Sequence, residues 1–180
     1  VDRALAAYGR DRVDLAIVSH PHPDHYAGLA GMTTPIDAVM FAPEPSTGPS
    51  AFRTVVDRLV ARGARVVVPT GRIAERAGVS LVVHWPYHDD GTTTSLSAAQ
   101  VRGVHAPSLV VEIRYRNRSI LFTGDLEAEG EAGFLDRWRT RTLRFGEDRA
   151  DVVKVPHHGS RTSSSSALVA TTRPVLAVIS

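Results

Sequence analysis

Four residues of the kinds that bind metals lie within six consecutive positions of a chain that has only eight histidines. They are His20, His22, Asp24 and His25, in the stretch HPHPDH. The two prolines favour extended backbone around them, which would place His20 beside His22 and leave Asp24 and His25 to point to a second position. Imidazole and carboxylate groups suit zinc, manganese or iron. The spacing therefore predicts a tight loop that supplies ligands to two neighbouring metal ions.

Further side chains of the same kinds occur where predicted strands begin or end. His105 precedes a predicted strand, whereas Asp125 and the pair His157 and His158 follow predicted strands. Loops at strand ends commonly gather into one site, so we expect these residues to join the histidine loop. For Asp125 a second interpretation stays open, because it precedes a helical pattern and could cap that helix. The two roles are compatible.

Short β-branched runs alternate with helical patterns along the chain, which is typical of a layered α/β fold. Helices are predicted over 51–63, 127–139 and 165–173, and a hairpin turn is predicted at 116–118. Loops are predicted over 43–50 and 86–107. The predicted strands cover 14–19, 38–43, 65–69, 79–85, 108–115, 119–124, 151–156 and 174–180.

The composition limits the classes of protein. The 180 residues suit one domain over 1–180, and 43% of them are hydrophobic, enough for a substantial core. The absence of cysteine excludes disulfides and thiolate ligands. No apolar run is long enough to span a membrane. Lys154 is the only lysine among 21 basic residues. Arginine suits phosphate recognition, although the codon bias of a GC-rich genome explains the same count.

Several stretches resemble the motifs of one known family. "SHPHPDHYAGL" resembles the signature loop of the metallo-β-lactamase fold superfamily. "GVHAPSLVVEI", "SILFTGDLEAEGE" and "DVVKVPHHGSRTSSSS" resemble its third, fourth and fifth motifs, in the same order. Within the superfamily, the last two are similar to ComEC-type competence proteins and their stand-alone soluble relatives. The resemblance implies a four-layer αββα sandwich. Compared with that fold, strands are missing at both ends, so we expect a trimmed domain of a longer protein.

The resemblance also implies a ligand set. His20, His22 and His105 would hold one metal ion, Asp24, His25 and a histidine of the fifth motif would hold another, and Asp125 would bridge both. ComEC-type proteins often carry an aspartate at the position of His22 and an asparagine pair at 105–106. The fuller set in this chain favours two bound ions, zinc or manganese. "HHGS" resembles the His-Ala-Ser motif of ribonuclease J-like members, which would assign His158 to the second ion.

The function implied is that of a dinuclear metal-dependent hydrolase, in which a hydroxide held between the metals attacks the substrate. A phosphodiester, most specifically DNA, is the expected substrate, on the ComEC-like resemblance. Asp24 would anchor the second ion and orient the hydroxide, and His157 would contact the scissile phosphate or give a proton to the leaving oxygen. Hydroxyl and N–H groups at a helix N-terminus would receive the phosphate, with Ser160, Thr162 and Ser163 as candidates.

Two alternatives remain. One is a small-molecule esterase of the choline-phosphate esterase or lactonase type, and the other is a non-catalytic module of a DNA-uptake machine. The chain is expected in the cytoplasm or as an extracytoplasmic domain of a membrane protein, whose own membrane helices would lie outside this sequence. Arg114, Arg116 and Arg118 are predicted to share one face of a hairpin, either solvated or as a nucleic-acid track. His84 and Trp85 are interpreted mainly as packing residues, with stacking on a substrate ring as the alternative for Trp85.

Overall fold

The computed structural model describes residues 1–42, 50–69, 72–86, 108–145 and 149–180. The chain divides into two compact units, Val1–Val68 and Pro69–Ser180, and each is described by itself. The prediction of a single domain over 1–180 stays a prediction. Every helix among the described residues is too short or too polar to cross a membrane.

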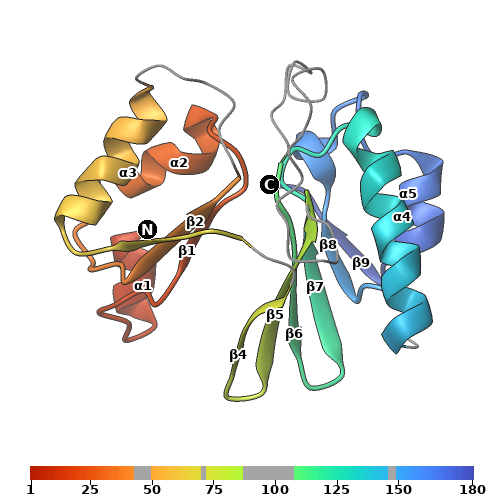
Figure 1. The fold of residues 1–180 in the computed structure, drawn as a ribbon, viewed down its shortest axis with the longest axis horizontal. Helices are drawn as coiled ribbons and strands as arrows, with labels where there is room; N and C mark the ends of the chain where they lie inside the picture. The colour runs from red at the N-terminus through yellow and green to blue at the C-terminus, as the bar shows by residue number, and fades with distance from the viewer. Residues whose placement is uncertain (43–49, 70–71, 87–107, 146–148) are drawn as a thin grey trace. The chain divides into compact units, whose positions relative to one another are not determined.

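The first unit is built around a three-stranded parallel sheet with the order β1-β2-β3. Parallel neighbours need a crossover between them, and two helices provide it, α2 after β1 and α3 after β2. Figure 1 shows both helices on the same side of these strands. The elements are α1 (Asp2–Ala7), β1 (Ala16–Val18), α2 (Pro23–Ala30), β2 (Ala38–Phe41), α3 (Ala51–Ala61) and β3 (Arg65–Val67).

Helix α3 follows from its sequence. The Ser50 side chain accepts a hydrogen bond from the Arg53 N–H at 3.0 Å, which caps the helix start. Phe52 and Leu59 belong to its buried stripe, and the Phe52 ring lies 5.1 Å from the ring of Tyr26 on α2. The predicted helix over 51–63 is thus confirmed, and it forms the core of the first unit together with α2 and the sheet.

Helix α2 corrects the prediction that the histidine stretch is an extended loop. His22 is extended, with φ −88° and ψ 145°, but the helix begins at Pro23. Proline tolerates the first helical position because the N–H it lacks has no partner there in any case. Asp24 lies in the first turn, where a negative charge suits the positive end of the helix dipole. Asp24 and His25 are therefore helical residues, and only His20 and His22 precede the helix.

The second unit contains a six-stranded sheet in sequential order, β4 to β9. The first four strands are antiparallel, and β7, β8 and β9 run parallel with α4 and α5 as crossovers. Figure 1 shows α4 and α5 side by side against this sheet. The elements are β4 (Arg72–Arg76), β5 (Val79–Trp85), β6 (Val110–Tyr115), β7 (Arg118–Phe122), α4 (Ala128–Phe145), β8 (Val152–Lys154), the 3₁₀ turn η1 (Pro156–Gly159), α5 (Ser166–Thr172) and β9 (Leu176–Val178).

The core of the second unit explains the two residues interpreted as packing residues. His84 is buried, its Nε2 lies 2.9 Å from Glu112 Oε2, and its ring faces the rings of Phe134 and Trp138 on α4. Trp85 packs against α4, where a Cβ added at Gly133 would overlap its ring. Packing is therefore the observed role of both side chains.

The hairpin between β6 and β7 is confirmed, with Arg116 at a left-handed φ of 54° in the turn. The predicted arginine track is wrong. Arg114 is the cross-strand partner of Ser119, and Tyr115 is the partner of Arg118, so Arg114 and Arg118 lie on opposite faces of the sheet. The two arginines belong to neighbouring cross-strand pairs, and side chains of neighbouring pairs point to opposite faces of the sheet.

Candidate metal centre

The candidate metal ligands of the first unit gather at the carboxyl end of β1. The ring of His20 lies 4.4 Å from the ring of His22 and 4.1 Å from that of His25. His25 Nε2 lies 3.3 Å from Asp24 Oδ2. His20 is fully buried, while Asp24 is exposed. The structure thus brings together all four residues that the sequence singled out in this stretch.

Ser19 links two of these imidazoles and was missed by the sequence analysis. Its Oγ lies 3.2 Å from His20 Nδ1 and 2.9 Å from His25 Nδ1. A hydroxyl oxygen can accept two hydrogen bonds, so both histidines can donate an Nδ1–H to it. In that tautomer Nε2 carries the lone pair, and it is the nitrogen through which either residue can bind a metal. A polar residue directly before a histidine motif is the signal that could have identified it.

In the second unit, the sheet brings Asp125 next to the two tandem histidines. Strands β7 and β8 are parallel neighbours, so the residues that follow them emerge at the same edge of the sheet. His157 Nε2 lies 3.9 Å from Asp125 Oδ2, and His158 Nε2 lies 3.7 Å from Asp125 Oδ1. Lys154 Nζ lies 3.7 Å from Asp125 Oδ1. The Asp125 side chain is 3% exposed, so burial strengthens its contact with the Lys154 ammonium group.

The capping interpretation of Asp125 fails as a full account. Helix α4 begins at Ala128, and its first intrahelical bonds run from the Gly130 and Glu131 N–H groups to the carbonyl of Glu127, at 2.8 and 2.9 Å. Glu127 is therefore the cap position. The Asp125 N–H donates to Ser108 Oγ at 2.8 Å, which fixes the backbone below the carboxylate.

The tandem histidines have an unusual backbone. His157 has φ 46° and ψ 46°, and His158 has φ 52° and ψ 23°, both in the left-handed region. Residues with a Cβ pay about 1–2 kcal/mol for that conformation. The turn is held by the His157 N–H, which donates to Gly124 O at 3.1 Å, and by Ser163 Oγ, which donates to Pro156 O at 2.9 Å. Such strain, held by surrounding bonds, is typical of functional sites.

Each tandem histidine has a different partner at Nδ1. For His157 the partner is Glu127 Oε1 at 3.1 Å, and for His158 it is the backbone carbonyl of Ser180 at 2.6 Å. With Nδ1 engaged in this way, both residues direct Nε2 toward Asp125. Glu127 was missed by the sequence analysis, which treated it only as part of a helical pattern.

The predicted phosphate-binding helix N-terminus holds a carboxylate of the protein itself. The Ser164 N–H donates to Glu131 Oε1 at 2.6 Å, and the Ser165 N–H donates to Glu131 Oε2 at 3.1 Å. Glu131 is 2% exposed. A negative group therefore already occupies the start of α5, and this corrects the idea that these N–H groups receive a substrate phosphate.

The three hydroxyl residues predicted to contact substrate differ in their surroundings. The Ser163 hydroxyl donates to the Pro156 carbonyl within the turn. Ser160 Oγ and Thr162 Oγ1 lie 3.0 Å apart on the surface, and Thr162 Oγ1 also donates to Glu127 Oε1 at 2.8 Å. His105 lies outside the described residues.

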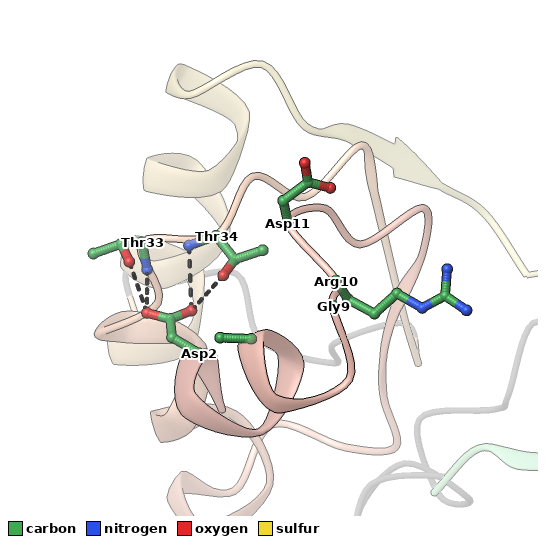
Figure 2. A pocket seen from close by; sticks show the side chains of 7 residues that line it. Asp2, Gly9, Arg10, Asp11, Thr33 and Thr34 are labelled. Atoms are coloured by element: carbon green, nitrogen blue, oxygen red, sulfur yellow. Dashed lines mark hydrogen bonds between the residues drawn. The ribbon is translucent and has the colours of Figure 1, made fainter.

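The first unit also has a separate hollow of about 600 Å³ beside α1, shown in Figure 2. Asp2 accepts four hydrogen bonds there from the N–H and hydroxyl groups of Thr33 and Thr34. These bonds, that of the Thr33 N–H first, hold the pKa of Asp2 well below its usual range. In Figure 2 the side chain of Arg10 points away from Asp2. The carboxylate thus ties α1 to the loop before β2 and has a structural role.

The donor set fits a divalent cation. Imidazole nitrogens and carboxylate oxygens are the ligands that zinc, manganese and iron accept, and a bound imidazole usually donates its other N–H to an oxygen. Ser19, Glu127 and the Ser180 carbonyl are such oxygens. The residues therefore carry both the ligand atoms and the supporting partners that metal binding requires.

Two curated relatives are similar to part of the chain. It is 35% identical over 92 residues to the uncharacterized protein YcaI of Escherichia coli. This match covers 51% of this chain and 10% of YcaI. It is 39% identical over 79 residues to Recombination protein 2 of Haemophilus influenzae. This match covers 44% of this chain and 9% of that protein. The matches thus span about a tenth of these relatives. The second agrees with the predicted likeness to ComEC-type proteins.

Solved structures show the same fold at low identity. A mutant of the CmlA beta-hydroxylase matches with a TM-score of 0.60 and 15% identity, over 93% of this chain and 36% of that one. CmlA, a diiron beta-hydroxylase from Streptomyces venezuelae, matches with a TM-score of 0.55 and 14% identity, over 93% and 35%. The family model described as the metallo-beta-lactamase superfamily matches residues 2–180. Because that match covers nearly the whole sequence, the chain belongs to the metallo-β-lactamase superfamily.

Proposed function

We propose that the chain is a hydrolase that depends on two divalent metal ions, zinc or manganese, and cleaves phosphodiesters, most specifically DNA. The observation that carries the proposal is the common arrangement of His25, His157 and His158, which direct Nε2 toward a carboxylate while an oxygen lies beside Nδ1. The proposed ligands are His20, His22, Asp24 and His25 in the first unit and Asp125 and His158 in the second, together with His105.

When bound, divalent ions would supply activation of water and neutralisation of charge on the substrate oxygens. The chain's own residues then have separate tasks. Asp24, exposed in the first turn of α2, orients the attacking water. His157 takes up the proton of the attacking water at Nε2 and gives it to the leaving oxygen. The surface hydroxyl of Ser160 donates to a phosphate oxygen, whereas the Thr162 hydroxyl donates to Glu127.

The choice of hydrolysis rests on family membership and the donor set. The fold alone does not decide the reaction, since CmlA carries the fold and is named a diiron beta-hydroxylase. The choice of DNA rests on the similarity to Recombination protein 2. Because that match covers a small share of the relative, its activity is carried over as a proposal.

One observation favours a second candidate, an esterase for small molecules such as choline phosphate or a lactone. The arginines of the hairpin engage the protein itself. Arg118 pairs with Asp151 at 2.9 Å, Arg114 lies 3.6 Å from Glu112, and Arg116 stacks over Tyr115. A long track for a polyanion along this hairpin is therefore not available from these side chains.

The test compares both substrate classes with zinc and manganese added separately. We expect cleavage of single- or double-stranded DNA, with affinity falling steeply as salt rises, because binding to phosphates releases counterions. Asp125→Asn is the inactive control. Rapid turnover of a small ester with no cleavage of DNA would move the assignment to the esterase. Inactivity toward both classes with metal bound would contradict hydrolysis.

A further inference from the structure

Glu127 lies in the second unit beside the tandem histidines, and its backbone is fixed on both sides. Its carbonyl accepts hydrogen bonds from the Gly130 and Glu131 N–H groups at the start of α4. The next residue, Ala128, donates its N–H to Thr162 O at 3.0 Å. The side chain of Glu127 therefore starts from a well-determined position, between the helix and the loop that carries Thr162.

One carboxylate oxygen of Glu127 receives two side chains. Oε1 lies 3.1 Å from His157 Nδ1 and accepts a hydrogen bond from Thr162 Oγ1 at 2.8 Å. An ionised carboxylate only accepts hydrogen bonds, so the proton of the contact with His157 must be on Nδ1. Thr162 holds the same oxygen from a second direction, which restricts the rotation of the carboxylate. The pair has the geometry by which carboxylates orient functional imidazoles.

We propose that Glu127 is the positioning residue of His157: it holds the imidazole in the Nδ1–H tautomer with Nε2 directed to Asp125, and Thr162 holds Glu127. Nε2 then lies 3.9 Å from Asp125 Oδ2 as an acceptor nitrogen that can take up a proton. The inference deepens the proposed function and rests on it for the catalytic use of His157. The tautomer itself does not depend on turnover.

The two tandem histidines have different kinds of partner at Nδ1, and this difference makes the role of Glu127 testable. The Nδ1 partner of His158 is a backbone carbonyl, which no substitution at Ser180 removes while the chain is intact. The partner of His157 is a side chain, so changing Glu127 affects one histidine and leaves the partner of the other in place. His158 thus serves as an internal reference in the same protein.

The experiment records the imidazole nitrogen signals of the metal-free full-length protein by long-range ¹H–¹⁵N NMR at one fixed pH. His157→Gln assigns the His157 signals. We expect a single Nδ1–H tautomer for His157 in the parent protein and a mixture of tautomers in Glu127→Ala, with His158 unchanged. Glu129→Gln, an exposed glutamate in the first turn of the same helix, is the matched control and should keep the parent spectrum. Thr162→Val should also give a mixture of His157 tautomers, with less of the second tautomer than Glu127→Ala gives.

In the metal-loaded protein, Glu127→Ala should lower turnover about 10–100-fold with an unchanged number of bound ions. Glu127→Gln should restore part of the loss, because the amide oxygen can still accept from Nδ1. An unchanged His157 tautomer in a folded Glu127→Ala variant would overturn the inference. If the tautomer shifts as expected but the parent protein hydrolyses nothing, the positioning by Glu127 stands and the proposed function fails.

Discussion

The two groups of histidines are positioned by different means. In the first unit, His20 and His25 are held by Ser19, a neighbour in the sequence, and His25 lies on a helix that starts at a proline. In the second unit, His157 and His158 have left-handed backbone and depend on partners 22 to 30 residues away. The first arrangement is specified locally, whereas the second requires a folded sheet and helix.

This difference decides where substitutions outside the motifs should matter. Around the first group, the residues with an effect should be those of the stretch itself. Around the second, Glu127 just before α4 and Glu131 in its first turn should matter as much as the residues of the turn. Substitutions around each group of histidines test that contrast.

Asp125→Asn should have the largest effect. The carboxylate lies under two imidazoles and an ammonium group, and an amide removes the negative charge while it keeps the shape. We expect turnover and metal affinity to fall by more than about 100-fold, beyond the loss seen for supporting residues. Metal titration and circular dichroism would check affinity and fold together. A variant that keeps both ions and a normal rate would leave Asp125 with a structural role only.

Glu131→Ala should strongly destabilise the second unit. The substitution removes a buried carboxylate that accepts hydrogen bonds from the Ser164 and Ser165 N–H groups, and both donors would remain partly buried. The loss should be about 2–3 kcal/mol in the free energy of unfolding, measured in urea. Glu129→Ala, at an exposed position of the same turn, should stay within about 0.5 kcal/mol. If both substitutions lowered the free energy of unfolding equally, the bonds from Glu131 to Ser164 and Ser165 would not account for the stability of this region.

Ser19→Ala should weaken metal binding without unfolding the first unit. Loss of the oxygen leaves His20 and His25 without the acceptor that fixes their Nδ1–H tautomers. Supporting partners of this kind usually account for about 10–100-fold in metal affinity, and we expect the lower end here, near tenfold. Competition with a chelating dye would measure it. Ser19→Thr keeps the hydroxyl and should bind like the parent, and equal weakening in both variants would count against a hydrogen-bonding role.

The smallest effect concerns acid stability. The Ser119 N–H, and then Arg118, hold the pKa of Asp151 below its ordinary value. The resulting stability is therefore fully present above the unfolded pKa, near 3.9, and is lost as the pH falls through the folded pKa. Asp151→Asn should cost about 1 kcal/mol at pH 7, and the difference from the parent should shrink below about pH 4. A difference that is constant across this range would exclude the ionised carboxylate as its source.

Much of the site was predictable because it is encoded by short motifs. The histidine stretch and Asp125 combine residue type with position at a strand end, which sequence shows directly. The helix α2 was missed because the prolines were interpreted as extending the whole stretch, although proline is well tolerated at the first helical position.

Partners that act across long sequence separations could not be predicted. Glu127 and Glu131 belong to an ordinary amphipathic helix in the sequence, and only the crossover between β7 and β8 places them beside the turn and the start of α5. Strand β4 was missed for a related reason. Its sequence, RIAER, is too polar to resemble a strand, and pairing with β5 determines its structure.

Metal titration of the metal-free protein tests whether the chain binds two ions. Calorimetric titration with zinc, and separately with manganese, should give two bound ions per chain. Turnover of a phosphodiester should return in proportion to the amount of metal bound. His20→Ala and His158→Ala should each lose one ion while the protein stays folded. Binding of one ion or none at saturating metal, by a folded parent protein, would contradict the dinuclear hydrolase.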